Sequence, residues 1–395
     1  MKKNNKIITV IMLSCLLIAG VCPVSGKKVQ AEELSLYARS ALLMDASNGR
    51  VLYEENGYQV MPMASTTKIM TCILALEYME QHPGAEKEKV TVSGYAARMP
   101  KVHLGMEKGE EYYLEDLLYS LMLKSHNDTA VAIAEHIDGD VETFAERMNR
   151  KAKELGCRNT HFITPNGLDA EENGRVHSAT AYDMARIASY AIKNERFKKI
   201  IGTSQYAFSE LTSGRTYQIY NTNRFLTMME GAIGVKTGFT ADAGYCFVGA
   251  LEREGRQYVS VVLASGWPPN KNWKWADTKV LMEYGLANYQ MKDIARDFEH
   301  EPVAVRDGVQ SNVPVETVEK KEGELKLLLS ANDKVSVKNT LQKELAAPVK
   351  KGTVVGYECY FVNDELMKKY EIKATESVEL RTYFYCLRQI FMLYF

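Results

Sequence analysis

The stretch Ser65-Thr66-Thr67-Lys68 begins an apolar run to Tyr78 in which hydrophobic residues recur at helical intervals. Two short motifs follow it in order: Ser125-His126-Asn127, in a break between two helix-like segments, and Lys236-Thr237-Gly238, on a strand-like segment. A Ser-x-x-Lys tetrapeptide alone carries little information, since residues 25–28 match it by accident. The order, spacing and local context of the three motifs together predict one active site.

The segments around these motifs predict an α+β fold, with an antiparallel sheet beside a helical lobe. Strand-like runs at residues 41–45 and 51–54 are joined by Asn48-Gly49, which is a strong hairpin signal. Helical periodicity dominates residues 114–192. The strand-like pattern from 233 to 264 predicts an antiparallel meander.

Two folded domains are expected in a chain of 395 residues, of which 46% are hydrophobic. The first spans residues 34–292 and ends with a helix at 275–289. Beyond it, short alternating stretches of Val, Lys and Glu with glycines at the turns predict a small all-β domain at residues 299–374.

The composition excludes some partners. A formal net charge of -1 gives no electrostatic reason to expect a nucleic acid, because nucleic-acid binding needs clustered Lys and Arg. The cysteines after residue 31 show no paired spacing, which argues against a disulfide framework and a Cys-based metal site. They are Cys72, Cys157, Cys246, Cys359 and Cys386.

Residues 1–31 have the pattern of a secretory signal peptide. A basic N-terminus precedes an apolar stretch from Ile7 to Val24, and a cleavage site is expected after Ala31. The alternative is a permanent membrane anchor, although the apolar stretch is short for a spanning helix. Either interpretation predicts export to the extracytoplasmic face of a membrane.

Residues 378–395 predict an amphipathic helix lying in the membrane interface. The segment carries Arg381, Arg388 and Gln389 among mostly aromatic and aliphatic side chains. It is cationic and too short to span a bilayer, which is typical of interfacial helices. The alternative is a terminal helix or strand packed on the protein.

The motifs can support nucleophilic catalysis without a histidine. A serine hydroxyl is a poor nucleophile until a neighbouring base takes its proton. Gly-x-Ser-x-Gly is absent, and no histidine has the local context of a triad. Lys68 lies one helical turn after Ser65 and can reach its hydroxyl. To act as the base, Lys68 needs a pKa far below about 10.4; burial and a second cation, best supplied by Lys236, both lower it.

The other motif residues would complete the cleft. The Ser125 hydroxyl would relay a proton to the leaving nitrogen, and the Asn127 amide would hold Lys68 and the substrate backbone. Lys236 and Thr237 suit an anionic substrate terminus. A helix N-terminus favours negative charge that develops on the substrate oxygen, so the backbone N–H of Ser65 is an expected oxyanion donor.

Residues 62–71, 125–128, 164–168 (Thr-Pro-Asn-Gly-Leu) and 236–240 together resemble the landmarks of the serine-type D-Ala-D-Ala carboxypeptidases, the low-molecular-mass penicillin-binding proteins. The resemblance covers Leu36 to about Ala374. It implies a penicilloyl-serine transferase fold, a β-rich domain and an amphipathic membrane anchor. The implied reaction removes the terminal D-alanine from peptidoglycan stem peptides through an acyl-Ser65 intermediate, and β-lactam antibiotics are implied to acylate the same serine. No metal or organic cofactor is implied.

The same resemblance implies further binding residues. Gly238 belongs to the third motif, and the backbone N–H of Phe239, just after it, would be the second oxyanion donor. Lys274 lies closest to the place of a basic residue that holds the substrate carboxylate, although Lys271 could serve instead. His126 stands where many relatives carry Gly, and a space-filling role is expected for it.

Two other functions remain open at this point. A class A β-lactamase shares the first landmarks, but its Glu-x-x-Leu-Asn loop is not found between Ser125 and Lys236. A non-hydrolytic penicillin or cell-wall-peptide sensor would keep the pocket and lose turnover. Release of D-alanine from a D-Ala-D-Ala peptide separates the enzyme from the sensor.

Overall fold

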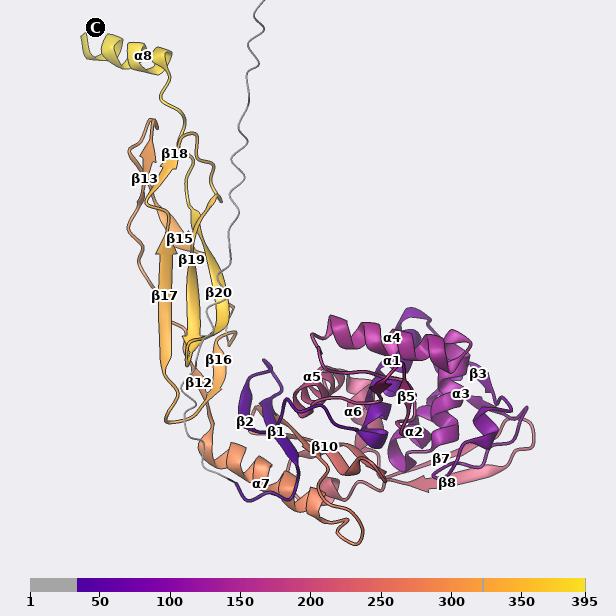
Figure 1. Ribbon diagram of the computed structural model, residues 1–395. Helices are drawn as coiled ribbons and strands as arrows, with labels where there is room; N and C mark the ends of the chain where they lie inside the picture. The colour runs from indigo at the N-terminus through magenta and orange to yellow at the C-terminus, as the bar shows by residue number, and fades with distance from the viewer. Residues whose placement is uncertain (1–33, 322, 395) are drawn as a thin grey trace, which may run out of the picture. The chain divides into compact units, whose positions relative to one another are not determined.

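The computed structural model describes residues 34–321 and 323–394 (Figure 1). The predicted signal peptide at residues 1–31 lies outside the described residues. The fold contains both helices and sheets, as predicted, and an all-β domain follows the first domain.

The first domain is built on a five-stranded sheet with the strand order β2-β1-β11-β10-β9. The predicted hairpin is confirmed, since β1 pairs antiparallel with β2, and the predicted meander is confirmed in β9, β10 and β11. β9 forms one edge of the sheet. The strands are β1 (Ser40–Asp45), β2 (Val51–Glu55), β9 (Ala232–Thr240), β10 (Gly244–Arg253) and β11 (Arg256–Leu263).

Helices cover both faces of this sheet (Figure 1). Successive side chains of a strand point to opposite faces. Accordingly, Leu43 of β1 contacts Gly285 of α7 (Trp273–Asn288), whereas Met44 accepts a hydrogen bond from Ser189 of α5 (Ala181–Ala191). The helices α7 and α5 therefore pack against β1 from opposite faces of the sheet.

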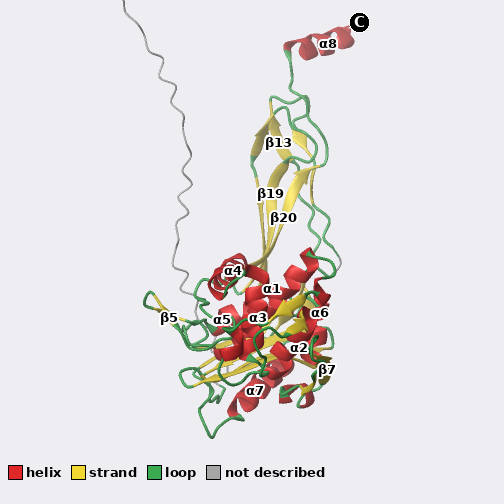
Figure 2. Cartoon of the chain, turned by 90° about the vertical axis from the view of Figure 1, so that its right-hand side faces the viewer, coloured by secondary structure: helices red, strands yellow, loops and turns green. Residues whose placement is uncertain are grey.

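The helical lobe surrounds α1 (Lys68–Gln81), which Figure 2 shows among the other helices. Every residue from Lys68 to Leu76 is buried, so this part of α1 is a core helix rather than an amphipathic surface helix. The helices that pack on it include α2 (Leu114–Lys124), α3 (Asn127–Asp138), α4 (Val141–Glu154) and α6 (Glu195–Gly202). α6 and the following hairpin of β7 (Gln205–Ser209) and β8 (Thr216–Tyr220) are not predicted from the sequence.

The all-β domain contains a four-stranded sheet, β15-β20-β19-β17, and a three-stranded sheet, β14-β13-β18. A core made mainly of valines joins the two sheets and includes Val303, Val355 and Ile372. β12 (Gln290–Asp293) and β16 (Lys326–Leu329) form a separate two-stranded antiparallel sheet. The other strands are β13 (Val303–Arg306), β14 (Asn312–Val313), β15 (Val315–Thr317), β17 (Val335–Leu341), β18 (Glu344–Ala346), β19 (Val354–Val362) and β20 (Glu365–Ala374).

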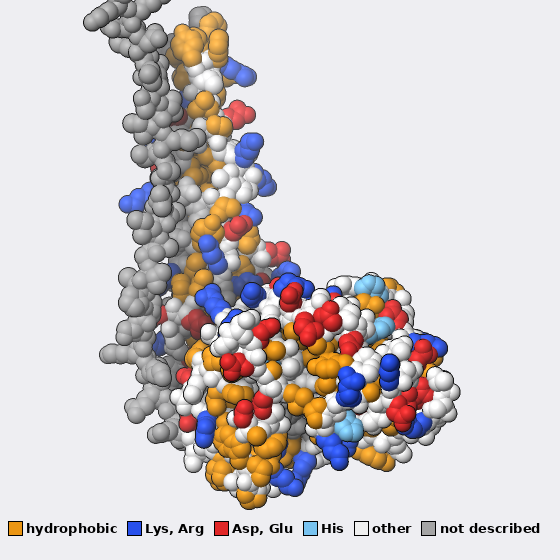
Figure 3. Space-filling view, turned by 45° about the vertical axis from the view of Figure 1, so that its right-hand side comes forward, with side chains coloured by type: hydrophobic (Ala, Val, Ile, Leu, Met, Phe, Trp, Pro, Cys, Tyr) orange, Lys and Arg blue, Asp and Glu red, His pale blue; other side chains and the backbone are white. Residues whose placement is uncertain are grey.

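The C-terminal helix α8 spans Tyr383–Tyr394. It begins later than the predicted start at residue 378, because Val378 and Leu380 form β-bridges with Val349 and Gly308. Most of its large apolar side chains are exposed, and Figure 3 shows the helix as a mainly hydrophobic surface. Among the described residues, none of the helices has the length and apolar character needed to cross a bilayer.

Candidate active site

Ser65 lies in a short 3-10 helix, η1 (Ala64–Thr67), that leads directly into α1. The hydroxyls of Thr66 and Thr67 donate hydrogen bonds to the carbonyl oxygens of Met63 and Ala64, at 2.6 and 2.7 Å. These bonds fix the turn that presents Ser65 at the start of the helix. Its place near a helix N-terminus agrees with the sequence-based prediction.

The Lys68 amine meets three oxygen atoms. Its Nζ lies 3.0 Å from Ser65 Oγ, 2.8 Å from Asn127 Oδ1 and 2.5 Å from the carbonyl oxygen of Asn166. A charged amine can donate to all three. A neutral amine has two N–H groups and one lone pair, and the Asn127 and Asn166 oxygens can only accept. The neutral form therefore keeps its lone pair for the Ser65 hydroxyl.

The surroundings of Lys68 favour this neutral form. Its side chain is fully buried, and burial holds its pKa well below the ordinary lysine value, with the positive charge of Lys236 adding to the effect and Asp128 opposing it. Lys236 is itself buried, which lowers its pKa to about 7, and its Nζ donates to the carbonyl oxygen of Thr237 at 2.9 Å. The structure thus brings the two lysines close enough to influence each other.

Strand β9 runs directly beside Ser65. A Cβ atom on Gly238 would lie 3.0 Å from the backbone nitrogen of Ser65 and 3.0 Å from Cβ of Ala64. A Cβ atom at these distances would force its neighbours to shift by a few tenths of an ångström, so glycine at this position lets the strand approach closely. The close approach places the backbone of Gly238, and hence the start of Phe239, beside Ser65, which is the arrangement that an oxyanion site at Ser65 would need.

Ser125 and Asn127 stand at the junction of α2 and α3. Ser125 has a left-handed backbone (φ 66°) and ends α2, while Asn127 is the first residue of α3. The Asn127 Nδ2 donates to the carbonyl oxygen of Pro100 at 3.1 Å, which directs Oδ1 toward Lys68. His126 is buried and its Nδ1 lies 2.8 Å from Ser120 Oγ.

These residues meet at an open cleft of about 480 Å³. Among the predicted site residues, Ser65, Ser125, Thr237, Gly238, Phe239 and Lys274 line it, while Lys68, Asn127 and Lys236 are buried. The cleft lining also includes Lys124, Arg224 and Lys271, and no acidic residue belongs to the described lining. An anionic substrate therefore suits this cleft.

The Lys274 amine lies over two aromatic rings at the cleft. Its Nζ is 4.5 Å from the ring centre of Tyr245 and 4.9 Å from that of Trp275, and it donates to the carbonyl oxygen of Lys271. Burial lowers its pKa to about 8, and the positive charges of Lys271 and Arg224 contribute. A substrate carboxylate would compensate this cluster of cations.

Sequence reasoning missed the roles of two residues within the family landmarks. Asn166 accepts from Lys68 through its backbone, so its side-chain type gives no signal of that contact. Asp128 accepts from the backbone N–H groups of Leu104 and Gly105 at 3.0 and 2.9 Å and thereby holds the cleft wall that includes Val102.

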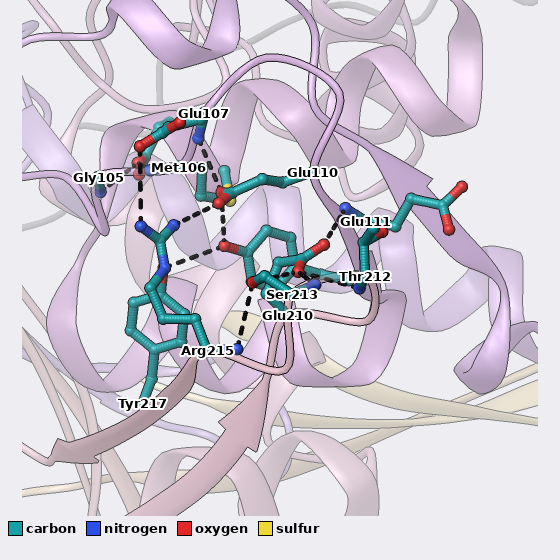
Figure 4. Close-up of polar contacts among 12 residues, drawn as sticks. Gly105, Met106, Glu107, Glu110, Glu111, Glu210, Thr212, Ser213, Arg215 and Tyr217 are labelled. Carbon is teal, nitrogen blue, oxygen red and sulfur yellow. Dashed lines mark hydrogen bonds and ion pairs between the residues drawn. The ribbon is translucent and has the colours of Figure 1, made fainter.

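An ionic network joins this wall to the β7–β8 hairpin (Figure 4). Arg215 of the hairpin turn contacts Glu110 at 2.6 Å and Glu107 at 3.9 Å. Glu210, at the same turn, accepts from the backbone N–H of Glu111 at 3.0 Å. After β8 the chain continues to Thr222 and Arg224, which also line the cleft.

Together the fold and the site define a class of protein. Ser-x-x-Lys lies at the start of the central helix of a helical lobe, and Lys-Thr-Gly lies on the edge strand of an antiparallel sheet. This is the arrangement of penicilloyl-serine transferases. The model of the D-alanyl-D-alanine carboxypeptidase family matches residues 27–266, and that of the penicillin-binding protein 5 C-terminal domain matches residues 290–380. The chain therefore belongs to the D-alanyl-D-alanine carboxypeptidase family.

Individual relatives agree with this assignment. The chain is 32% identical over 360 residues to the D-alanyl-D-alanine carboxypeptidase DacF of Bacillus subtilis, covering 90% of this chain and 88% of that protein. The structure of penicillin binding protein 5 from Haemophilus influenzae is similar with a TM-score of 0.71 at 25% identity, over 88% of this chain and 99% of that one. The ampicillin-bound penicillin-binding protein D2 of Listeria monocytogenes gives a TM-score of 0.56 at 30% identity, over 65% of this chain and 100% of that one.

Proposed function

We propose that this protein is a serine D,D-carboxypeptidase that removes the terminal D-alanine from peptidoglycan stem peptides and thereby remodels the cell wall. The observation that carries the proposal is the 3.0 Å approach of the buried Lys68 amine to the Ser65 hydroxyl. Family membership and the cationic cleft support a substrate that ends in a D-Ala-D-Ala carboxylate.

In the acylation step, neutral Lys68 takes the proton of the Ser65 hydroxyl while Oγ forms a bond to the carbonyl carbon of the penultimate D-alanine. The backbone N–H groups of Ser65 and Phe239 stabilise the negative charge on the carbonyl oxygen. The proton then passes through Ser125 to the leaving nitrogen, the C–N bond breaks and D-alanine departs. Asn127 keeps Lys68 oriented throughout.

In the deacylation step, water attacks the acyl-Ser65 ester, and its proton returns to the serine oxygen through Lys68. A β-lactam antibiotic would enter the same path, but its leaving amine stays attached to the acyl group and blocks water. Penicillin is therefore expected to acylate Ser65 and to remain bound.

The substrate carboxylate would lie between Thr237 and Lys274. Thr237 lines the cleft on the edge strand β9, and Lys274 supplies positive charge from α7. Lys271 lines the same region and is the alternative cation. A D-Ala-D-Ala carboxylate in this place directs the scissile carbonyl toward Ser65.

The test is incubation of the full chain with a D-Ala-D-Ala-terminated peptide, followed by measurement of D-alanine. Steady release is expected from the wild type and none from Ser65→Ala. Stable penicillin acylation without peptide turnover would instead identify a sensor, and rapid penicillin hydrolysis would identify a β-lactamase. Normal D-alanine release by Ser65→Ala would refute Ser65 as the nucleophile.

We further propose that the protein is exported and held at the outer face of the cell membrane. Residues 1–31 would direct export, and the exposed apolar side chains of α8 would enter the membrane interface. In this arrangement the domain at residues 34–292 performs catalysis, and the β-rich domain at 299–374 holds it at a distance from the membrane.

A further inference from the structure

A buried histidine outside the three motifs, His177, forms hydrogen bonds with two chain segments that lie next to Lys68. His177 is 3% exposed. Its Nδ1 accepts from the backbone N–H groups of Ile163 and Thr164, at 3.0 and 3.3 Å. On the other side of the ring, Nε2 lies 2.7 Å from Thr67 Oγ1. The ring therefore bridges the loop before Asn166 and the turn that carries Ser65.

The backbone groups at the two ends of this bridge determine which atoms donate and which accept hydrogen bonds along it. Because Nδ1 accepts from two backbone N–H groups, the ring proton of neutral His177 lies on Nε2 and is donated to Thr67 Oγ1. The Thr67 hydroxyl then donates to the carbonyl oxygen of Ala64 at 2.7 Å, since a carbonyl can only accept. Burial lowers the pKa of His177 to about 3, and the positive charges of His161 and Lys68 add to this, so the ring stays neutral at ordinary pH.

Both ends of the bridge adjoin atoms that contact Lys68. Ile163 and Thr164 precede Asn166, whose carbonyl oxygen accepts from Lys68 Nζ. Thr67 precedes Lys68 itself, and its partner Ala64 precedes Ser65. A change in the bridge would therefore alter the distance between the Asn166 carbonyl and the Ser65 hydroxyl, two of the three groups that surround the Lys68 amine.

We propose that His177 is a positioning residue. Through Thr67 and the loop before Asn166, it holds the Asn166 carbonyl oxygen and the Ser65 hydroxyl at hydrogen-bonding distance from the Lys68 amine. This inference rests on the proposed function, since it assumes that Lys68 activates Ser65. It adds to that function a requirement that the three motifs do not contain: a hydrogen-bonded ring at residue 177.

The experiment measures penicillin acylation of the full chain by stopped flow, which separates the dissociation constant of the first, non-covalent complex from the acylation rate constant. His177→Phe keeps a ring and removes both nitrogens. His177→Asn keeps an acceptor for the loop N–H groups, and Thr67→Val cuts the other end. His161→Phe is the matched control, because the buried Nε2 of His161 has no hydrogen-bond partner among the described residues.

His177→Phe is expected to lower the acylation rate constant by about 100-fold, the size of effect that a misplacement of about 1 Å can produce. The dissociation constant should stay near the wild-type value, because His177 does not line the cleft. Thr67→Val should lose rate in the same way, His177→Asn should recover part of it, and His161→Phe should react like the wild type.

A merely structural role for His177 would reduce the fraction of protein that reacts without changing its rate constant. Near wild-type rate constants in folded His177→Phe and Thr67→Val would overturn the proposal. If His177→Phe does not fold, His177→Asn decides, because Thr67→Val also removes the hydrogen bond from Thr67 to Ala64; an acylation rate constant of His177→Asn equal to that of the wild type would then overturn the proposal. Failure of the proposed function is distinguishable, because it would appear in the wild type as absent D-alanine release, whereas failure of this inference appears only in the variants.

Discussion

Substitution of Gly167 by alanine tests whether the Asn166 loop positions Lys68, the proposed base. Gly167 has φ +80°, and an added Cβ would lie 2.1 Å from the carbonyl oxygen of Ala64 and 2.8 Å from Thr67 Oγ1. Real Cβ contacts do not fall below 3.0 Å, so the loop and the serine turn must separate by about 1 Å, a displacement that can reduce a rate about 100-fold. We expect Gly167→Ala to slow penicillin acylation of Ser65 by about that factor.

Gly174→Ala is the matched control for this substitution. Gly174 has a similar backbone, φ +74°, but no atom lies within 4 Å of the place that an added Cβ would take. Each alanine should cost about 1–2 kcal/mol of unfolding free energy through its left-handed backbone. Gly167→Ala should cost more because of its overlap with Ala64, and only Gly167→Ala should also lose acylation rate. Urea unfolding and stopped-flow acylation measure the two quantities. Equal acylation rates in the two variants would refute the argument that the loop positions Lys68.

Three further predictions concern the base, acid stability and membrane binding. Lys68→Ala should slow acylation by about 10²–10⁴-fold, as for a lost proton-transfer partner, and an unchanged rate would remove Lys68 from the mechanism. The pKa of the Glu210 carboxyl is lowered to about 2, chiefly by the hydrogen bond from the Ser213 hydroxyl and then by backbone N–H groups. In the unfolded chain the pKa of a glutamate is about 4.3. The stabilisation that ionised Glu210 gives the fold is therefore complete above about pH 4.3 and is lost as the pH falls toward 2. The difference in melting temperature between the wild type and Glu210→Gln should therefore vanish near pH 2, and a difference independent of pH would contradict this. A chain that ends at Arg381, which keeps the β-bridges of Val378 and Leu380, should leave the membrane fraction while still cleaving soluble peptides; unchanged membrane binding would reject α8 as the anchor.

The sequence predicts the centre of the site because the key side chains stand on regular elements. The helical period places Lys68 one turn after Ser65, and the strand pattern places Lys236 and Thr237 on one edge of the meander. The hairpin at Asn48-Gly49 is also predictable, since it depends on residues close together in the chain. Local patterns thus predict most of the sheet and much of the helical lobe.

The remaining features depend on contacts that sequence patterns do not carry. The acceptor on Asn166 is a backbone oxygen, which every residue type has. His177 meets Thr67 across 110 residues, and its role becomes visible only when both are buried together. The β7–β8 hairpin and its Arg215 network likewise depend on Glu107 and Glu110 from a distant loop. The late start of α8 follows from β-bridges that compete with the helix for residues 378–380.

The pH dependence of Ser65 acylation by penicillin tests the account most directly. A neutral Lys68 must accept the serine proton, so the rate constant should rise with pH as Lys68 loses its own proton. Because burial and Lys236 hold the pKa of Lys68 well below the ordinary lysine value, we predict that the rate constant reaches its plateau at a pH well below that ordinary value. A rate constant that keeps rising until pH approaches about 10.4, the pKa of an unperturbed lysine, would contradict it.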